Sequence, residues 1–220
     1  PVGDDAAVDD PTGLHDTAPT TWSIAIDAGA TIASLYDGID GAGTLISTTS
    51  LPVNAPWHLR FLTADATGKA AYFFGGHDGL GRADDVYRLG PATSTSTWQT
   101  IGSMPVGRTE TCAVEVEGKI YVIGDYNHSS IHDRLEVYDP ETASWTRLAD
   151  IPTGRGMAAA DVVDGKIYLI GGNDQYTNHW LTTNEVYDPV TDSWAARAAL
   201  PGTARGLLSA VAFDGRSYVM

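Results

Sequence analysis

Three polar loops of this sequence, at residues 77–82, 125–132 and 173–180, hold the side chains best suited to chemistry. Each loop follows a short apolar run that ends in glycine or Gly-Asp. Aromatic rings stack on the apolar faces of sugars and planar groups, while Asp, Asn and Arg side chains form paired hydrogen bonds. We therefore expect a surface that binds a glycan or a protein. The candidates, with three arginines that each follow a proline, are His77, Asp78, Arg108, Tyr126, Asn127, His128, Arg155, Asp174, Tyr176, His179, Trp180 and Arg205.

A metal site is an alternative use of the histidines. Imidazole is the commonest ligand of transition metals, and the loops contain His77, His128, His132 and His179. His128 and His132 are four residues apart, but in a loop this spacing does not bring two side chains to one face. We expect no metal and no other cofactor.

Catalysis is a second alternative. The sequence has no nucleophile elbow, phosphate-binding loop or zinc motif. Carboxylates such as Asp125 and Asp174 could act as an acid and base pair, but a chain rich in surface Asp offers such pairs by chance. We assign no catalytic residue and favour a protein that is not an enzyme, with a carbohydrate-active enzyme as the alternative.

The loops recur because they belong to a repeated unit. In one copy, Gly165-Lys166 leads into an apolar run, Gly171-Gly172 ends it, and Tyr187 and Trp194 follow. The opening glycine recurs at positions 68, 118, 165 and 215, with spacings of 50, 47 and 50 residues, and the tryptophan recurs at 98, 145 and 194. A period near fifty with a double glycine, a Tyr and a Trp in fixed order is typical of kelch repeats. From about Leu51 to Met220 the chain resembles the kelch-repeat family.

The resemblance implies an all-β, kelch-type β-propeller built from four-stranded antiparallel blades. After an acidic flexible leader at 1–21, we expect a propeller over 22–220, with complete blades at about 53–105, 106–152 and 153–201. An incomplete blade at 202–220 could be closed by residues 31–51. A fragment of a larger propeller, or a subunit completed by strand pairing with another chain, are the alternatives.

Closure makes a specific prediction about strand pairing. Three N-terminal runs, 22–26, 31–36 and 44–48, have strand-like patterns separated by glycines. An unpaired apolar edge is costly in water, so we expect Tyr218–Met220 to pair with Thr31–Tyr36, and Thr44–Thr48 to be the outer neighbour.

Strand alternation also predicts where the candidate residues lie. Because neighbouring strands are antiparallel, loops between second and third strands share a face with the connections between blades. This places the three loops and the arginines together, although the arginines recur at the repeat period and could instead hold the loops by bonding backbone carbonyls. The second strand is apolar on both faces, as expected between two neighbouring blades. We expect two sets of aromatic residues to pack between blades, namely Tyr72, Tyr121, Tyr168 and Tyr218, and Trp98, Trp145 and Trp194.

The resemblance also includes one kind of enzyme. Propellers of the galactose-oxidase type bind copper with a cysteine that is cross-linked to a tyrosine on the next blade. Cys112 has the matching inner-strand place, but the residue after Arg155-Gly156 is Met157. The cross-linked cofactor cannot form at these positions.

Composition narrows the partners and the location. The formal net charge is −15, from 28 acidic and 13 basic residues, so nucleic acids and anionic membranes would be repelled. No apolar run is long enough to span a membrane. We interpret the chain as an extracellular or surface-exposed propeller that binds a glycan or protein, with self-association through the incomplete blade and a cytoplasmic location as alternatives.

Overall fold

The structure, a computed structural model, describes residues 70–76, 82–90, 97–127, 130–131, 133–174, 179–206, 208, 210–213 and 216–219. It also describes the backbone of strands at 22–26, 32–37, 45–50 and 62–64. Every regular element in these residues is a β-strand, and every pair of strands is antiparallel, which confirms the predicted fold class. The predicted leader at 1–21 lies outside the described residues.

Three four-stranded sheets follow one another along the chain. Sheet I contains β4 (Leu62–Ala64), β5 (Ala71–Phe74), β6 (Asp85–Leu89) and β7 (Gln99–Ser103). Sheet II contains β8 (Cys112–Val116), β9 (Lys119–Ile123), β12 (Leu135–Asp139) and β13 (Ser144–Arg147). Sheet III contains β14 (Ala159–Val163), β15 (Lys166–Ile170), β18 (Asn184–Asp188) and β19 (Ser193–Ala196). In each sheet the strands are paired in chain order, as the repeat predicts.

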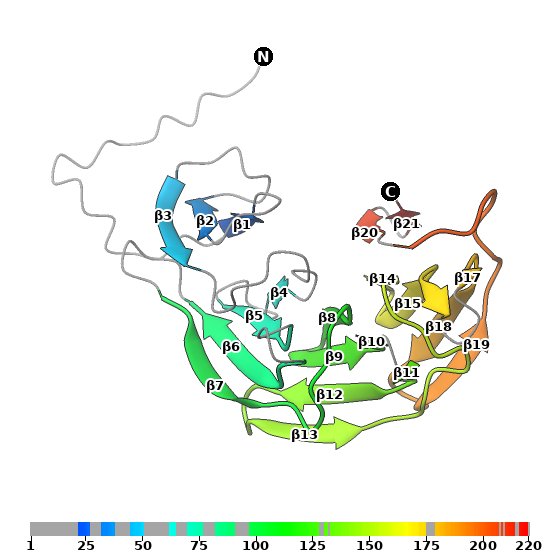
Figure 1. The fold of residues 1–220 in the computed structure, drawn as a ribbon, viewed down its shortest axis with the longest axis horizontal. Coiled ribbons are helices and arrows are strands. Elements are labelled where there is room, and N and C mark those ends of the chain that lie inside the picture. Colours follow the sequence, from blue (N-terminus) through cyan, green and yellow to red (C-terminus); the bar gives the residue numbers. More distant parts are fainter. Residues whose placement is uncertain are drawn as a thin grey trace, which may run out of the picture.

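Smaller sheets complete the described part. Sheet IV has two strands, β20 (Ala210–Phe213) and β21 (Arg216–Val219). Two short ribbons, β10 (Tyr126–Asn127) with β11 (Ser130–Ile131) and β16 (Asn173–Asp174) with β17 (His179–Trp180), extend from the ends of β9 and β15. Figure 1 shows sheets I to IV along a curve, with β8 and β14 on its inner side and β7, β13 and β19 on its outer side.

The N-terminal strands form a sheet of their own. The three predicted runs are strands β1 (Trp22–Ile26), β2 (Ile32–Asp37) and β3 (Leu45–Ser50), in the order β1-β2-β3. The predicted pairing of Tyr218–Met220 with Thr31–Tyr36 is wrong in this structure. Because β1 and β3 occupy both edges of β2, no edge is left for β21, whose described partner is β20.

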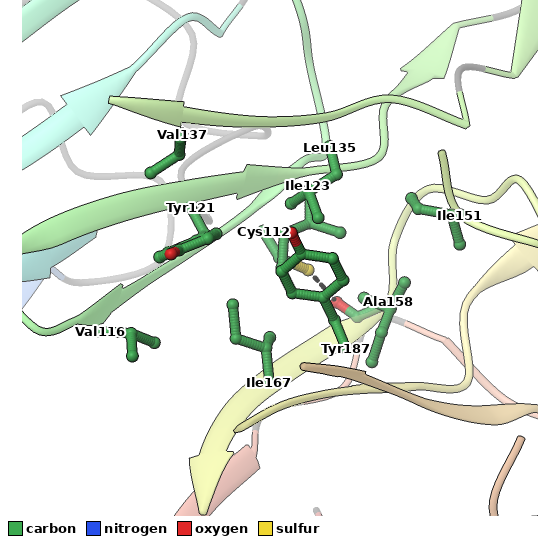
Figure 2. Packing of buried hydrophobic residues seen from close by; sticks show 11 residues of the cluster. Cys112, Val116, Tyr121, Ile123, Leu135, Val137, Ile151, Ala158, Ile167 and Tyr187 are labelled. Atoms are coloured by element: carbon green, nitrogen blue, oxygen red, sulfur yellow. Dashed lines mark hydrogen bonds between the residues drawn. The ribbon is translucent and has the colours of Figure 1, made fainter. Parts of the chain in front are cut away.

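The second strand of each sheet is apolar on both faces because each face packs on a different neighbour. In β9, Ile120 and Val122 belong to a cluster with Tyr72 and Phe74 of sheet I. The alternate residues of β9 belong to a second cluster, which joins sheet II to sheet III. Figure 2 shows this cluster, in which the Cys112 thiol donates a hydrogen bond to the carbonyl oxygen of Ala158 at 3.1 Å. Cys112 therefore acts as a small core residue at a contact between sheets.

The repeated tyrosines are buried where another sheet covers them. Tyr72 and Tyr121 are buried, and their rings lie 6.3 and 6.1 Å from the rings of Tyr138 and Tyr187, which belong to the following sheets. Tyr168 is half-buried, and Tyr218 is 46% exposed. The predicted packing between sheets is therefore confirmed for the first two tyrosines.

The repeated tryptophans are half-buried, and two of them, Trp145 and Trp194, contact the preceding unit. The Trp145 ring lies 5.8 Å from that of Phe74 in sheet I, edge to face. The indole N–H of Trp194 donates to the carbonyl oxygen of Ala149, in the connection that follows sheet II, at 2.9 Å, as expected for a covered indole. The Trp98 indole N–H has no partner among the described residues.

Removal of the Trp145 ring tests this packing. Trp145→Ala should lower the free energy of unfolding by about 2–4 kcal/mol, somewhat less than for a fully buried Trp, because part of the ring is in solvent. Chemical denaturation of the variant and the wild type measures this difference. Thr146→Ala, at the exposed neighbouring position, should change stability by less than about 0.5 kcal/mol. A loss below about 1 kcal/mol for Trp145→Ala would contradict the contact between sheets I and II.

Buried tyrosines should make the fold sensitive to alkaline pH. Burial raises the pKa of Tyr121, Tyr138 and Tyr187 above the ordinary value of 10.0, and the Tyr187 hydroxyl also donates to Asp192 at 2.7 Å. Above pH 10.0 these tyrosines lose their protons in the unfolded chain before they do so in the folded one. The contribution of these three tyrosines to the free energy of unfolding should therefore be constant below this pH and fall as pH rises further.

Tyr187→Phe should make this alkaline decline less steep, because one of the three titrating groups is removed. Urea denaturation at several pH values between about 7 and 11 measures the slope. Below the tyrosine range, the variant and the wild type should differ by a constant amount. Equal slopes above pH 10.0 would show that Tyr187 does not contribute.

Candidate binding face

Backbone hydrogen bonds bring the second-to-third loops and the connections between sheets to one side of the molecule, which we call the loop face. Gly76 and Gly172, which follow β5 and β15, donate their amides to the carbonyl oxygens of Arg108 and Arg205 at 2.9 and 3.0 Å. The Arg205 amide in turn donates to the carbonyl of Leu181 at 3.2 Å. The arrangement predicted from strand alternation is therefore present in the described part of the chain.

Glycine is needed at these joins because a side chain would strike the next connection. A Cβ atom on Gly75, Gly124 or Gly171 would lie 2.5, 2.3 or 2.6 Å from the carbonyl oxygen of Arg108, Arg155 or Arg205. All three glycines also have positive φ angles, of 66°, 71° and 65°. Both observations explain why a residue with a Cβ atom would not fit at these three positions.

The ribbon formed by β16 and β17 presents an exposed aromatic side chain on the loop face. Asn173 is paired with Trp180, and Asp174 with His179. The Leu181 amide donates to the carbonyl oxygen of Gly172 at 2.9 Å, which closes the base of the ribbon. Trp180 is 43% exposed and His179 is exposed, so both can contact a ligand.

Trp180 is also held in place by the connection into sheet IV. A Cβ atom on Gly206 would lie 2.2 Å from the Trp180 ring, so glycine at this position lets the indole lie flat against the backbone. Asn173, the first residue of the ribbon, is buried, and its backbone exchanges hydrogen bonds with Gly156 at 2.8 and 3.3 Å. The Trp180 ring is thus exposed, while backbone hydrogen bonds fix the ribbon that carries it.

Several predicted site residues cannot be placed. The residues outside the described part are His77, Asp78, His128, His132 and Tyr176. For Tyr126 and Asn127 the structure describes the backbone of β10 alone. Of the candidates, the loop face therefore presents Asp174, His179, Trp180 and Arg205 as described side chains.

Arg108 and Arg155 were predicted as ligand-binding residues, and the structure assigns them a different role. Both are buried, with 0% and 1% of their surface exposed. The Arg108 guanidinium binds Glu136 and the Val122 carbonyl oxygen. These arginines cannot reach a ligand on the surface, so their placement in the binding site is wrong and the alternative, an internal brace, is correct.

The Arg155 guanidinium makes the equivalent contacts in sheet III. It binds Glu185 and donates to the carbonyl oxygens of Leu169 at 2.9 Å and Thr153 at 2.8 Å. Burial lowers the pKa of Arg108 and Arg155, and the neighbouring carboxylates oppose this effect. The sequence reasoning overlooked Glu136 and Glu185, although each stands directly before the repeated Val-Tyr pair of a third strand.

Arg205 has the same place in the repeat but a different environment. It is exposed, and its guanidinium donates to the backbone carbonyl oxygens of Pro201 and Thr203 at 3.1 and 3.2 Å. No carboxylate of the described residues binds it. Of the three predicted arginines, Arg205 alone can meet a ligand.

The carboxylates suggested as a catalytic pair have separate environments. Asp125 is fully buried, where it accepts hydrogen bonds from Arg82 at 2.7 Å and from the Thr109 amide at 2.8 Å. It joins sheet I to sheet II, at the place where Gly76 and Gly172 stand in the other units. Within the described ranges, no three His, Cys, Asp or Glu side chains come together as a metal site would require.

Comparisons with known proteins agree with this architecture. The family model described as the KLHDC2/KLHL20/DRC7 Kelch-repeats domain matches residues 61–220. The chain belongs to the kelch-repeat family. A putative F-box/kelch-repeat protein of Arabidopsis thaliana is 29% identical over 93 residues, which make up 42% of this chain and 23% of that protein. The chain thus spans less than a quarter of the length of that relative.

The solved structure of YjhT has the same fold. It superimposes with a TM-score of 0.66 at 17% sequence identity, over 76% of this chain and 59% of YjhT. At this identity the likeness shows the fold alone, which is a kelch β-propeller. None of the residues that the structure describes forms a helix with the length and apolar character that a membrane crossing would need.

The buried ion pair in sheet III offers a test of its structural role. Arg155→Ala should lower the free energy of unfolding by about 3–5 kcal/mol, because the Glu185 carboxylate would remain buried without its partner. Arg205→Ala is the matched control at the exposed repeat position, and it should cost less than about 0.5 kcal/mol. Chemical denaturation measures both. Similar losses for the two variants would contradict the different roles assigned to Arg155 and Arg205.

Proposed function

We propose that this kelch propeller is a binding module that recognises a protein partner through its loop face, with Trp180 as the main contact. Kelch propellers generally bind protein partners, so the family supports this class of function. The single observation that carries the proposal is the 43% exposed indole of Trp180 on the β16–β17 ribbon. Exposed aromatic residues on a rigid support lose little conformational entropy when they bind, and Trp is common among residues that dominate interface energy.

The neighbouring side chains suit a partner with both polar and apolar groups. His179 and Asp174 stand opposite each other on the ribbon, one position along from the Trp180–Asn173 pair, so their side chains lie on the other face of the ribbon from the indole. A partner that contacts both faces of the ribbon could cover the indole with an apolar side chain and bond to these polar groups with a peptide group or a side-chain amide. Arg205 lies at the next connection and adds a positive charge to this part of the face.

A glycan is the second candidate ligand. An exposed indole also suits a sugar ring, whose apolar face stacks on the aromatic group. A location outside the cell accompanies this proposal, on the basis of the acidic composition, with a net charge of −15.

A phage-displayed peptide library, selected on the immobilised wild-type chain, tests the main proposal. Synthetic versions of the selected peptides should bind the wild type, and Trp180→Ala should weaken binding by at least about tenfold, the usual loss for a central aromatic contact. Isothermal titration calorimetry measures the affinities. The melting temperature of Trp180→Ala should stay close to that of the wild type, because the ring is largely outside the core.

Val190→Ala provides the matched control. Val190 is 93% exposed and lies in the turn between β18 and β19, which strand alternation places on the side opposite the loop face. Selected peptides should bind Val190→Ala and wild type equally. If they bind Trp180→Ala as tightly as wild type, the proposed site is wrong; Trp180-dependent binding on a glycan array, with no selected peptides, would favour the glycan.

A further inference from the structure

Gly206 lies in the connection between sheets III and IV, in contact with the Trp180 ring. A Cβ atom on Gly206 would lie 2.2 and 2.5 Å from Cζ3 and Cε3 of that ring. Both distances are far below the separation that non-bonded carbon atoms prefer. No residue with a Cβ atom can therefore share this space with the indole in its observed position.

The backbone of the connection does not itself require glycine at this position. The glycines that follow the second strands have positive φ angles, as at Gly171 (65°), whereas Gly206 does not. Thr109 stands at the same place in the repeat, directly after Arg108, and the connection accommodates its Cβ atom. The space that the indole needs is therefore the reason for glycine at this position.

On its other side, Gly206 faces a backbone that hydrogen bonds hold in place. The same Cβ atom would lie 3.1 Å from the carbonyl oxygen of Met157, in the connection between sheets II and III. The Met157 amide donates to the carbonyl oxygen of Glu110 at 3.1 Å, and the preceding Gly156 exchanges two hydrogen bonds with Asn173. A Cβ atom would thus displace the end of the indole side chain rather than this bonded backbone.

Backbone hydrogen bonds also fix Gly206 relative to the ribbon that carries Trp180. The amide of Arg205 donates to the carbonyl oxygen of Leu181 at 3.2 Å, and the amide of Gly172 donates to that of Arg205 at 3.0 Å. Gly172 precedes the ribbon and Leu181 follows it. The indole therefore lies against a segment that is bonded to both ends of its own ribbon.

The contact with Gly206 places the six-membered ring of the indole against the protein. Cζ3 and Cε3 belong to that ring, whereas the N–H belongs to the five-membered ring, on the far side of the indole from these two atoms. The N–H of Trp194 has a backbone acceptor at 2.9 Å, but no described residue accepts from the N–H of Trp180. A Trp N–H usually has a hydrogen-bond partner when a contact buries it, so a partner that covers Trp180 should supply an acceptor.

We propose that Gly206 is a positioning residue of the Trp180 site, which holds the six-membered ring on the connection so that the indole N–H donates to a backbone carbonyl oxygen of a bound peptide. This inference rests on the proposed function, because it concerns the partner of the same site. The hydrogen bond fixes the position of the peptide backbone while an apolar side chain of the peptide packs on the indole. A larger residue in place of Gly206 turns the ring out of this orientation and leaves the sheets intact.

Gly206→Ala tests the positioning role by calorimetric titration. Peptides selected on the wild type should bind this variant at least about tenfold more weakly, because a displaced aromatic residue loses most of its contact. In a chain that already carries Trp180→Ala, Gly206→Ala should cause no further loss, since the two residues act as one unit. Thr203→Ala, at an exposed side chain of the same connection, is the matched control and should bind the peptides like wild type.

Fluorine NMR separates a displaced indole from a damaged fold. A chain labelled with 5-fluorotryptophan contains six labelled residues, and the Trp180 signal is the one that Trp180→Phe removes. Gly206→Ala should shift this signal without any ligand and leave that of Trp194 in place. The melting temperature should stay close to that of the wild type, because the added methyl group displaces an exposed side chain.

An isosteric analogue tests the predicted hydrogen bond. Benzothienylalanine in place of Trp180 has sulfur where the indole has its N–H and keeps the shape of the ring. Peptide affinity should fall about fivefold, the usual net effect of one hydrogen bond. The melting temperature should not change, since no described residue accepts from this N–H.

Two results would overturn the inference and leave the proposed function in place. They are Trp180-dependent peptide binding that Gly206→Ala does not weaken, and equal affinity of the benzothienylalanine protein. A large fall in the melting temperature of Gly206→Ala, with shifts of the other fluorine signals, would also overturn it, because Gly206 would then have a structural role. In contrast, peptides that bind Trp180→Ala as tightly as wild type would overturn the proposed function itself.

Discussion

The contact on which the rest of the structure depends is the join between consecutive sheets at the connecting arginine. The backbone carbonyl of Arg155 lies against Gly124 of sheet II, while its guanidinium binds Glu185 of sheet III. Arg155 therefore contacts the end of the second strand of sheet II and the third strand of sheet III. Because a guanidinium is planar and has five donors, it can satisfy a carboxylate and several carbonyl oxygens within a buried space.

This join explains both the buried charges and the glycines of the repeat. The connection comes so close to the preceding strand that only glycine fits, and the closeness removes the arginine from water. A buried guanidinium is tolerable when a carboxylate and backbone oxygens surround it. Arg205, which no carboxylate of the described residues binds, is exposed and bonds to backbone oxygens of its own connection.

A rigid join also leaves the loops between second and third strands free to carry function. The ribbon formed by β16 and β17 extends from the end of β15, outside the apolar clusters that join the sheets. Its base is closed by the Leu181 bond to Gly172, and its Trp180 side chain is 43% exposed. Loops on such scaffolds can change in length and side chains while the fold is kept, which is why family membership alone does not name the partner.

The repeat, the all-β class and the paired strands of each sheet can be predicted from the order of residues alone. These features follow from local patterns, because the order of residues shows alternating apolar positions, turn glycines and a period near fifty residues. It also predicted which loops and connections share a face, because antiparallel pairing decides this without coordinates. Trp180 was selected correctly as an exposed aromatic residue of that face.

Whether chemically similar residues are buried or exposed depends on three-dimensional packing. Arg108, Arg155 and Arg205 look alike in the repeat, yet the first two are buried against glutamates and the third is exposed. The difference depends on Glu136 and Glu185, which lie 28 and 30 residues further along the chain, in strands whose packing no local pattern records. The same holds for β2, which has a strand pattern that would suit pairing with β21 but has both edges filled by β1 and β3. Burial and strand pairing depend on which residues are neighbours in space. A local sequence pattern can therefore predict that a segment is a strand, but it cannot predict which strand pairs with it.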